Sequence, residues 1–191
     1  MELLPFLRTQ ARANRLANHR LHGAMRTLSR DEFHAPRTSF FPSLAKTLDH
    51  ILLVDTFYLA ALYGEADMRA QCERLLPSDT VAELADAQAQ ADRRFIDLLD
   101  RMSPLALDEI IDLDRGDHIQ HEQRGHVIAH LLNHQVHHRG QVHAMLAGTA
   151  VTPPQLDEFL MPSEAHLRRD DMAALGWNES RLFADHDVRS G

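Results

Sequence analysis

The segment HVIAHLLNHQVHHRGQ, from His126 to Gln141, predicts a helix and carries most of the candidate site of this chain. It holds five of the fourteen histidines, between residues 126 and 138. Each residue turns an α-helix by about 100°, so His134 and His138 fall within about 20° of Val127, on the apolar face with Leu131, Val142 and Met145. His126, His130 and His137 lie about 80° away from that pair and are predicted to be surface or interface residues.

His134 and His138 are four residues apart, so their rings can reach a single ion, at about 2.0–2.1 Å if it is zinc. A third imidazole is available in LAKTLDHILLVD, where His50 shares a helical line with Val54 and Phe57. An unpaired polar group in a core is costly, so such a ring needs a hydrogen bond or a metal. Two interpretations stay open: a metal site of His50, His134 and His138, or a helical interaction module in which these rings make only hydrogen bonds.

Apolar spacing in the rest of the chain predicts three more long helices and a hairpin. The first covers Leu3 to Leu28, with Asn14 and Asn18 facing inward, and the second covers 39–64, is apolar almost all round and is expected to be the most buried. A Thr80–Glu83 capping box opens the third, which runs to Met102. The segment EIIDLDRGDHIQHEQ predicts a short hairpin around residues 114–117, before the fourth helix over 123–147.

These elements predict an all-α fold, with residues 1–150 forming a four-helix metal-binding bundle. Residues 151–191 are expected to form a C-terminal tail packed on the bundle within the same domain, with short helices near Leu156 and Ala173. A chain of 191 residues is long enough for a core of its own without disulfides.

The charge and composition exclude several classes of partner. The net charge is −8 and Lys46 is the only lysine, so no basic run is present and nucleic acid is not an expected partner. The longest apolar run is interrupted by Asp55 and is too short to span a membrane. Cys72 is the only cysteine, which rules out an intramolecular disulfide, and the N-terminus does not read as a signal peptide, so we expect a cytoplasmic protein.

Other catalytic motifs do not fit the chain. HEQRGH, residues 121–126, has its histidines five apart with Gly125 between them, unlike the zincin HExxH. Glu-x-x-His pairs, GxSxG, Walker and dinucleotide-binding motifs do not occur. Cys72 is interpreted as an incidental thiol. Asp55 is a candidate for orienting an imidazole and Tyr58 for donating into a pocket, with an ordinary helix-end contact as the alternative for both.

Three segments resemble the DinB/YfiT-like family: QARANRLANHRL (10–21), SFFPSLAKTLDHILLVD (39–55) and HLLNHQVHHRGQVHAML (130–146). PPQLDEF (153–159) is a weaker fourth, and the likeness covers roughly four-fifths of the chain. The resemblance implies an up-down-down-up four-helix bundle, commonly a homodimer, with a three-histidine metal site facing a pocket. The ligands carried over are His50, His134 and His138, whereas Arg139, Gly140 and Gln141 complete the motif without binding metal.

The resemblance also implies a class of function, because members of the family resemble thiol-dependent transferases or hydrolases. We therefore expect a metal-dependent enzyme with an open coordination position, which takes a low-molecular-weight thiol or another small molecule. Zinc or nickel is the expected ion, with iron or manganese as further candidates. The alternative is a non-catalytic, stress-associated helical dimer whose metal is structural or adventitious. Gly140 in mid-helix costs about 1 kcal/mol relative to Ala, which suggests a close helix approach. The sequence names no catalytic acid or base.

Overall fold

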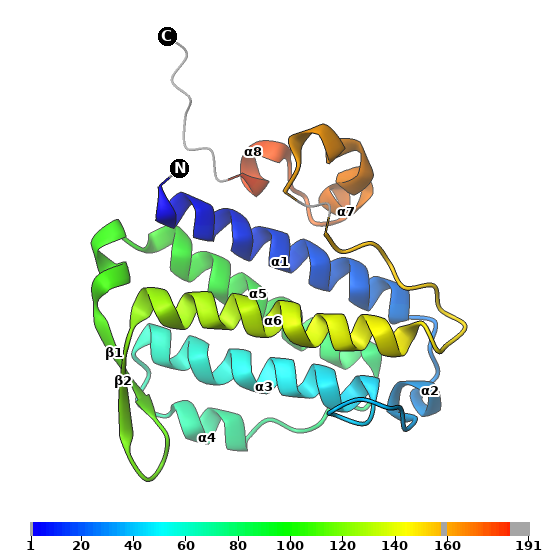
Figure 1. Ribbon diagram of the computed structural model, residues 1–191, viewed down its shortest axis with the longest axis horizontal. Coiled ribbons are helices and arrows are strands. Elements are labelled where there is room, and N and C mark those ends of the chain that lie inside the picture. Colours follow the sequence, from blue (N-terminus) through cyan, green and yellow to red (C-terminus); the bar gives the residue numbers. More distant parts are fainter. Residues whose placement is uncertain (1, 158–159, 184–191) are drawn as a thin grey trace.

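Four long helices form the framework of the fold, as described by a computed structural model over residues 2–157 and 160–183. They are α1 (Leu3–Met25), α3 (Leu44–Tyr63), α5 (Val81–Arg101) and α6 (Arg124–Leu146). In Figure 1, α1 and α6 run in one direction and α3 and α5 in the other, with α1 packed on α5 and α3 on both α5 and α6. None of the described helices has the length and apolar content needed to cross a bilayer.

The core lies between these four helices and is made of aliphatic and aromatic side chains from all of them. Its largest fully buried members include Leu21, Met25, Leu44, Ile51, Leu59, Leu84, Leu99 and Ile128. The inward amides predicted on the first helix are buried too, with Asn14 at 5% and Asn18 at 2% exposure. Polar groups at such depth need hydrogen-bond partners, and both amides have them in the described structure.

The second predicted helix ends where expected, before Gly64, but it begins at Leu44 and not at residue 39. Ser43 caps α3 by accepting a hydrogen bond from the Lys46 backbone amide, and Gly64 ends it with φ 71° in the left-handed region. One side of this nearly all-apolar helix stays accessible, because Leu53 is 39% exposed and Val54 and Phe57 are only half-buried. Those side chains line a hollow next to the candidate site.

The predicted hairpin is confirmed. Strands β1 (Ile110–Asp114) and β2 (Ile119–Gln123) pair antiparallel, with Asp112 opposite His121. In the turn, Gly116 has φ 96°, and its amide donates to Asp114 Oδ1 at 2.8 Å. The 3₁₀ helix η1 (Pro104–Asp108) leads into the hairpin, and β2 passes directly into α6. The hairpin therefore stands at the N-terminal end of α6 (Figure 1).

Short helices fill the remaining connections. They are α2 (Arg30–His34), α4 (Met68–Glu73), the 3₁₀ helix η2 (Pro162–Arg168), α7 (Arg169–Ala174) and α8 (Glu179–Leu182). Helix α7 matches the expected helix near Ala173. The expected helix near Leu156 is wrong, since residues 152–156 have no regular structure. Pro153 and Pro154 explain this, because proline lacks an amide donor and disfavours helix in the residue before it.

The described part of the C-terminal segment packs on α1. Met172 and Leu182 bury themselves against Ala13, Leu16 and Ala17 of that helix. The guanidinium of Arg168 is fully buried and pairs with Glu179, while Arg20 of α1 pairs with Asp171 at 2.5 Å.

The capping box predicted at the start of α5 is present, and its contribution to stability can be tested. The Glu83 amide donates to Thr80 Oγ1 at 3.2 Å, and the Thr80 amide donates to Glu83 Oε2 at 3.3 Å. Replacing Thr80 by Ala leaves the Glu83 amide without its side-chain acceptor, so Thr80→Ala should lower the free energy of unfolding by about 1 kcal/mol in urea denaturation. The exposed Thr152→Ala is the matched control, and equal stability of the two variants would contradict the assignment.

Candidate metal centre

Three imidazoles converge between α3 and α6. His50 comes from α3 and His134 and His138 from α6, and one ring nitrogen of each lies within 4.8 Å of the others. The Nε2 atoms of His134 and His50 are 3.1 Å apart. Two ligands of one tetrahedral zinc ion are about 3.4 Å apart, given bonds of about 2.0–2.1 Å. The separation of this pair is therefore close to what a shared ion requires.

Gln141 fixes the ring of His138. Its Oε1 lies 2.8 Å from His138 Nδ1, so this nitrogen donates to the amide and Nε2 keeps a lone pair for an ion. Gln141 also reaches His137, at 3.2 Å. Sequence reasoning treated Gln141 as part of a motif and missed this contact, although its position one turn after His138 was a usable signal.

The environment keeps the three rings neutral. Burial, with the neighbouring His138 and His50, lowers the pKa of His134 to about 3. Burial also lowers the pKa of His50 and of His138. Neutral imidazoles are the form that binds metal, so protons compete weakly for these nitrogens near pH 7.

Phe41 covers one side of the cluster. Its ring centroid is 4.3 Å from that of His50 and 5.7 Å from that of His138. The residue lies in the connection between α2 and α3, so this loop, and not a long helix, closes the site on that side. Sequence reasoning did not identify Phe41, because no helical periodicity relates it to the histidines.

The two histidines of α6 lie at the edge of its buried face and not at its centre. His138 is 7% exposed and His134 is only half-buried, whereas Gln135 and Arg139 are 2% and 7% exposed. On a helical wheel with Val127 at 0°, the buried residues of α6 centre at about 60°, whereas His134 lies at about −20°. The buried face is therefore rotated away from the apolar line of Val127, because the buried side chains of Gln135 and Arg139 extend it on one side only.

A network of buried polar side chains explains the inward placement of Gln135. The Nε2 atoms of Gln135 and of Gln88 both donate to Asp55 Oδ2, Gln88 at 2.6 Å. Gln88 Nε2 also lies 3.2 Å from Asp92 Oδ1. The expectation that Asp55 orients an imidazole is thus corrected: its hydrogen-bond partners in the described structure are two amides, and these bonds join α3, α5 and α6.

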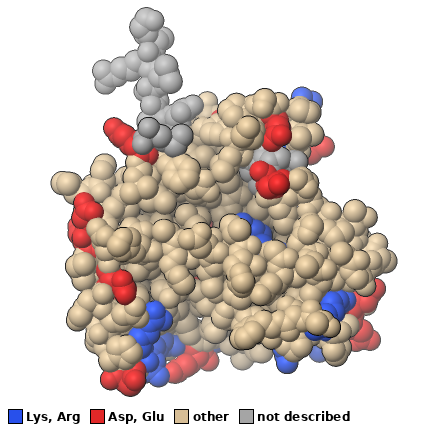
Figure 2. All heavy atoms as spheres, in the orientation of Figure 1, with Lys and Arg blue, Asp and Glu red and all other residues tan. Residues whose placement is uncertain are grey.

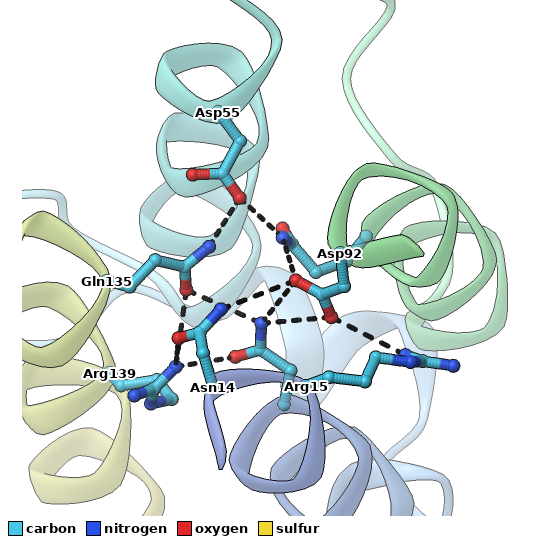
Figure 3. A network of polar contacts seen from close by, with 8 residues as sticks. Asn14, Arg15, Asp55, Asp92, Gln135 and Arg139 are labelled. Carbon is cyan, nitrogen blue, oxygen red and sulfur yellow. Dashed lines mark hydrogen bonds and ion pairs between the residues drawn. The ribbon is translucent and has the colours of Figure 1, made fainter. Parts of the chain in front are cut away.

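The other half of the network ties α1 to α5 and α6 (Figure 3). Asn18 Nδ2 donates to Asp92 at 3.0 Å, and Asn18 Oδ1 accepts from Arg139 Nη1 at 3.0 Å. Arg139 also donates to Asn14 Oδ1, and Arg15 pairs with Asp92 at 3.5 Å. Burial raises the pKa of Asp92, and burial with the nearby Asp92 raises that of Asp55 well above its usual value.

A hollow of about 400 Å³ opens beside His134; we call it the His134 hollow. It is lined by Leu53, Val54, Phe57, Tyr58, Cys72, Arg115, His130 and His134. Tyr58, predicted as a pocket donor, is therefore a lining residue. A second hollow of about 480 Å³ is lined by Gln141 and by residues 37–39, 144, 145 and 148. None of the three imidazoles lines it, so the His134 hollow is the one that meets the candidate ligands.

Three other histidines of α6 were predicted to be surface or interface residues, and all three lie at the surface. His126, His130 and His137 are exposed, and His130 also packs its ring against Tyr58, with centroids 5.2 Å apart. Gly140 has no close neighbour in the described chain, since a Cβ added there would meet nothing within 4 Å. The close approach expected at Gly140 is therefore not made within the described chain.

Comparison with known proteins places this geometry in context. The sequence profile of the DinB family matches residues 6–172. Protein DinB of Bacillus subtilis strain 168 is 27% identical over 158 residues, which cover 75% of this chain and 87% of that protein. The crystal structure of a DinB-like protein from Bacillus cereus ATCC 10987 superposes with a TM-score of 0.56 at 16% identity, covering 73% of this chain and 89% of that one.

The buried carboxyl of Asp55 gives a pH-dependent prediction. Its pKa is raised in the folded state, so above the unfolded pKa of about 3.9 the folded chain holds more protons than the unfolded one, and stability falls as pH rises. Asp55→Asn removes this slope. In measurements from pH 4 to pH 7, the variant should therefore gain stability relative to wild type as pH rises, by up to about 1.4 kcal/mol per pH unit while the carboxyl is ionised in the unfolded chain and still protonated in the folded one.

Urea denaturation at several pH values measures this difference. Asp86→Asn, on the exposed side of α5, controls for the loss of one formal charge. A stability difference between Asp55→Asn and wild type that stays constant over this range would show that Asp55 is charged throughout and that its burial has been misjudged.

Proposed function

The chain belongs to the DinB family, and we propose that it is a metal-dependent enzyme whose divalent ion is held by His50, His134 and His138. One observation carries the proposal: three neutral ring nitrogens lie within 4.8 Å of one another beside a hollow large enough for a small molecule. Three protein ligands are the usual complement of a catalytic zinc site, whereas structural zinc sites are closed by four.

The residues around the cluster suit an exchangeable site. Gln141 holds His138 in the tautomer that presents Nε2, and Phe41 excludes solvent from the side of His50 and His138. The His134 hollow, which Phe41 does not line, leaves an approach to His134 open. When bound, the ion would supply a Lewis acid that activates a water or a thiol.

Two reaction classes follow from that chemistry, thiol transfer and hydrolysis, and we place thiol transfer first. Imidazole ligands suit zinc or nickel, with iron or manganese as further candidates. We also propose that the four long helices form an up-down-down-up bundle, in agreement with the chain directions in Figure 1, and that the C-terminal segment belongs to the same domain.

We further propose that two copies of the chain associate through the exposed side of α6. The exposed residues in the middle of this helix carry no formal charge: Ala129, His130, Asn133, Val136, His137, Gly140 and Ala144. Figure 2 shows the same feature, with acidic and basic atoms mostly at the margins of this view. Val136 is 62% exposed, and Gly140 leaves room for a close approach by a second helix.

Metal analysis and spectroscopy of the cobalt-substituted protein test the proposed metal-dependent function. Protein purified without a histidine tag should bind about one divalent ion per chain, and adding a small thiol to the cobalt-substituted protein should produce a thiolate-to-cobalt charge-transfer band. Gln141→Ala should weaken metal binding about 10–100-fold, because it frees the ring of His138. The His134→Ala, His138→Ala double variant should not retain the ion at all.

His126→Ala, which removes an exposed imidazole from the same helix, is the matched control and should bind metal as wild type does. Equal metal content in wild type and the double variant would remove the proposed site. A cobalt spectrum that thiol leaves unchanged would instead support the non-catalytic alternative, in which the metal is structural.

Sedimentation velocity tests the association. A two-fold interface brings each residue of one copy near the same patch of the other, so Val136→Glu places two new carboxylates in an uncharged interface and should give a monomer. Ala82→Glu, on the exposed side of α5, should leave the dimer intact. A monomeric wild type at micromolar concentration would contradict this proposal without affecting the metal site.

A further inference from the structure

The charge of the His134 hollow is unbalanced. Arg115 is the one side chain with a formal charge among the described residues that line it, and no carboxylate shares the lining. The described structure gives Arg115 no ion pair; its hydrogen-bond partners are the neutral Gln120 and Tyr58. A chain with net charge −8 thus places an unneutralised guanidinium beside its candidate metal site.

The guanidinium is fixed in place although Arg115 lies in an exposed turn. Its Nε donates to Gln120 Oε1 at 2.8 Å, and one Nη donates to the Tyr58 hydroxyl at 3.2 Å. The group also stacks over two rings, 5.1 Å from the centroid of Phe57 and 5.6 Å from that of Tyr58. A free surface arginine would make none of these contacts, and ordering the side chain in advance reduces the entropy lost on binding a ligand.

A carboxylate of an adjoining hollow is bound by an amide and makes no ion pair with Arg115 in the described structure. Glu122 lines an adjoining hollow, and its Oε1 accepts from Gln120 Nε2 at 2.7 Å. Gln120 therefore satisfies Glu122 with its nitrogen and Arg115 with its oxygen. The remaining donors of Arg115 stay available for an anion, as does the proton of Tyr58, whose oxygen accepts from Arg115.

The floor between Arg115 and the histidines is apolar. Leu53, Val54 and Phe57 line it from α3. Tyr58 lies two turns along α3 from His50, which corresponds to about 12 Å of helix. On α6, His130 lies one turn from His134, and the ring of His130 contacts Tyr58. A ligand that spans the hollow would have a polar group at each end and an apolar middle.

We propose that the His134 hollow selects small organic carboxylates, with the carboxylate bound by Arg115 and Tyr58, an apolar body on Leu53, Val54 and Phe57, and the reacting group directed toward His134. This assignment rests on the proposed metal-dependent function and names its substrate class. A guanidinium matches a carboxylate in shape and charge, and hydrogen bonds between charged partners are about twice as strong as neutral ones. Neutral ligands gain only the apolar contact.

The only cysteine of the chain provides a reporter of occupancy. Cys72 is half-buried and lines the hollow, so a bound ligand should slow its alkylation by iodoacetamide. The probes are 4-phenylbutyrate and its neutral analogue 4-phenylbutanol, applied to zinc-loaded full-length protein. The carboxylate should protect Cys72 at a concentration at least about tenfold lower than the alcohol, the difference expected for a charge-assisted hydrogen bond.

Variants of Arg115 identify the residue responsible. Arg115→Met should bring the two concentrations together, and Arg115→Lys should restore part of the preference. Arg69→Met is the matched control, because Arg69 lies against Gly116 of the same turn without lining the hollow, and it should keep the full preference. Circular dichroism of each variant confirms that the fold is retained.

Three outcomes would overturn the assignment: equal protection by both compounds in wild type, protection by neither, or a preference that survives in Arg115→Met. If the surviving preference disappears in His138→Ala, the carboxylate binds the ion itself, and the metal site stands while this assignment falls. If wild type holds no zinc but keeps a preference that depends on Arg115, the proposed enzyme fails and the carboxylate site stands. The two proposals can therefore fail separately.

Discussion

The rotation of α6 about its own axis is the constraint on which the candidate site depends. Gln135 and Arg139, which directly follow His134 and His138 in sequence, are buried and bonded to side chains of α1 and α3. A hydrogen bond adds only about 1 kcal/mol to stability, but a buried polar group that loses its partner costs about 1–3 kcal/mol. Any other rotation of α6 would leave several such groups unpaired, so the network holds the two histidines toward His50.

Burying the groups of this network carries a large desolvation cost. Asp55 and Asp92 are both buried, and Asp55 Oδ1 has no hydrogen-bond partner in the described structure. Burial lowers the pKa of Arg139 to about 10 despite the two nearby carboxylates, which shows how strongly the site disfavours isolated charge. Buried ion pairs often contribute little net stability compared with apolar packing. The contribution of this network is geometric: its hydrogen bonds relate α1, α3, α5 and α6 in one register, where aliphatic side chains alone would tolerate small rotations.

The sequence predicted features whose causes are local and missed those that depend on distant partners. The capping box at Thr80, the hairpin around Gly116 and the end of α3 near Gly64 follow from a few neighbouring residues, and all were found. The sequence also predicted that His50, His134 and His138 converge, because each ring shares a helical line with apolar residues. The placement of Gln135 and Arg139 was missed, since a polar side chain reads as outward-facing until its partner, 80 or more residues away, is known. Phe41 and Arg115 were missed for a related reason: both lie in connections, where no periodicity relates a residue to the site.

The two ends of the His134 hollow are held by different parts of the fold. At the histidine end, the rings are set by α3 and α6, whose positions are tied to the core and to the polar network. At the other end, Arg115 belongs to a hairpin turn whose residues 115–118 are all exposed. A change in the turn disturbs few buried contacts, whereas a change near His134 disturbs the relation between four helices. The histidines, which would determine the chemistry, and Arg115, which would determine which molecule is bound, thus belong to separate parts of the fold. The turn that carries Arg115 can therefore vary while the histidine cluster stays unchanged.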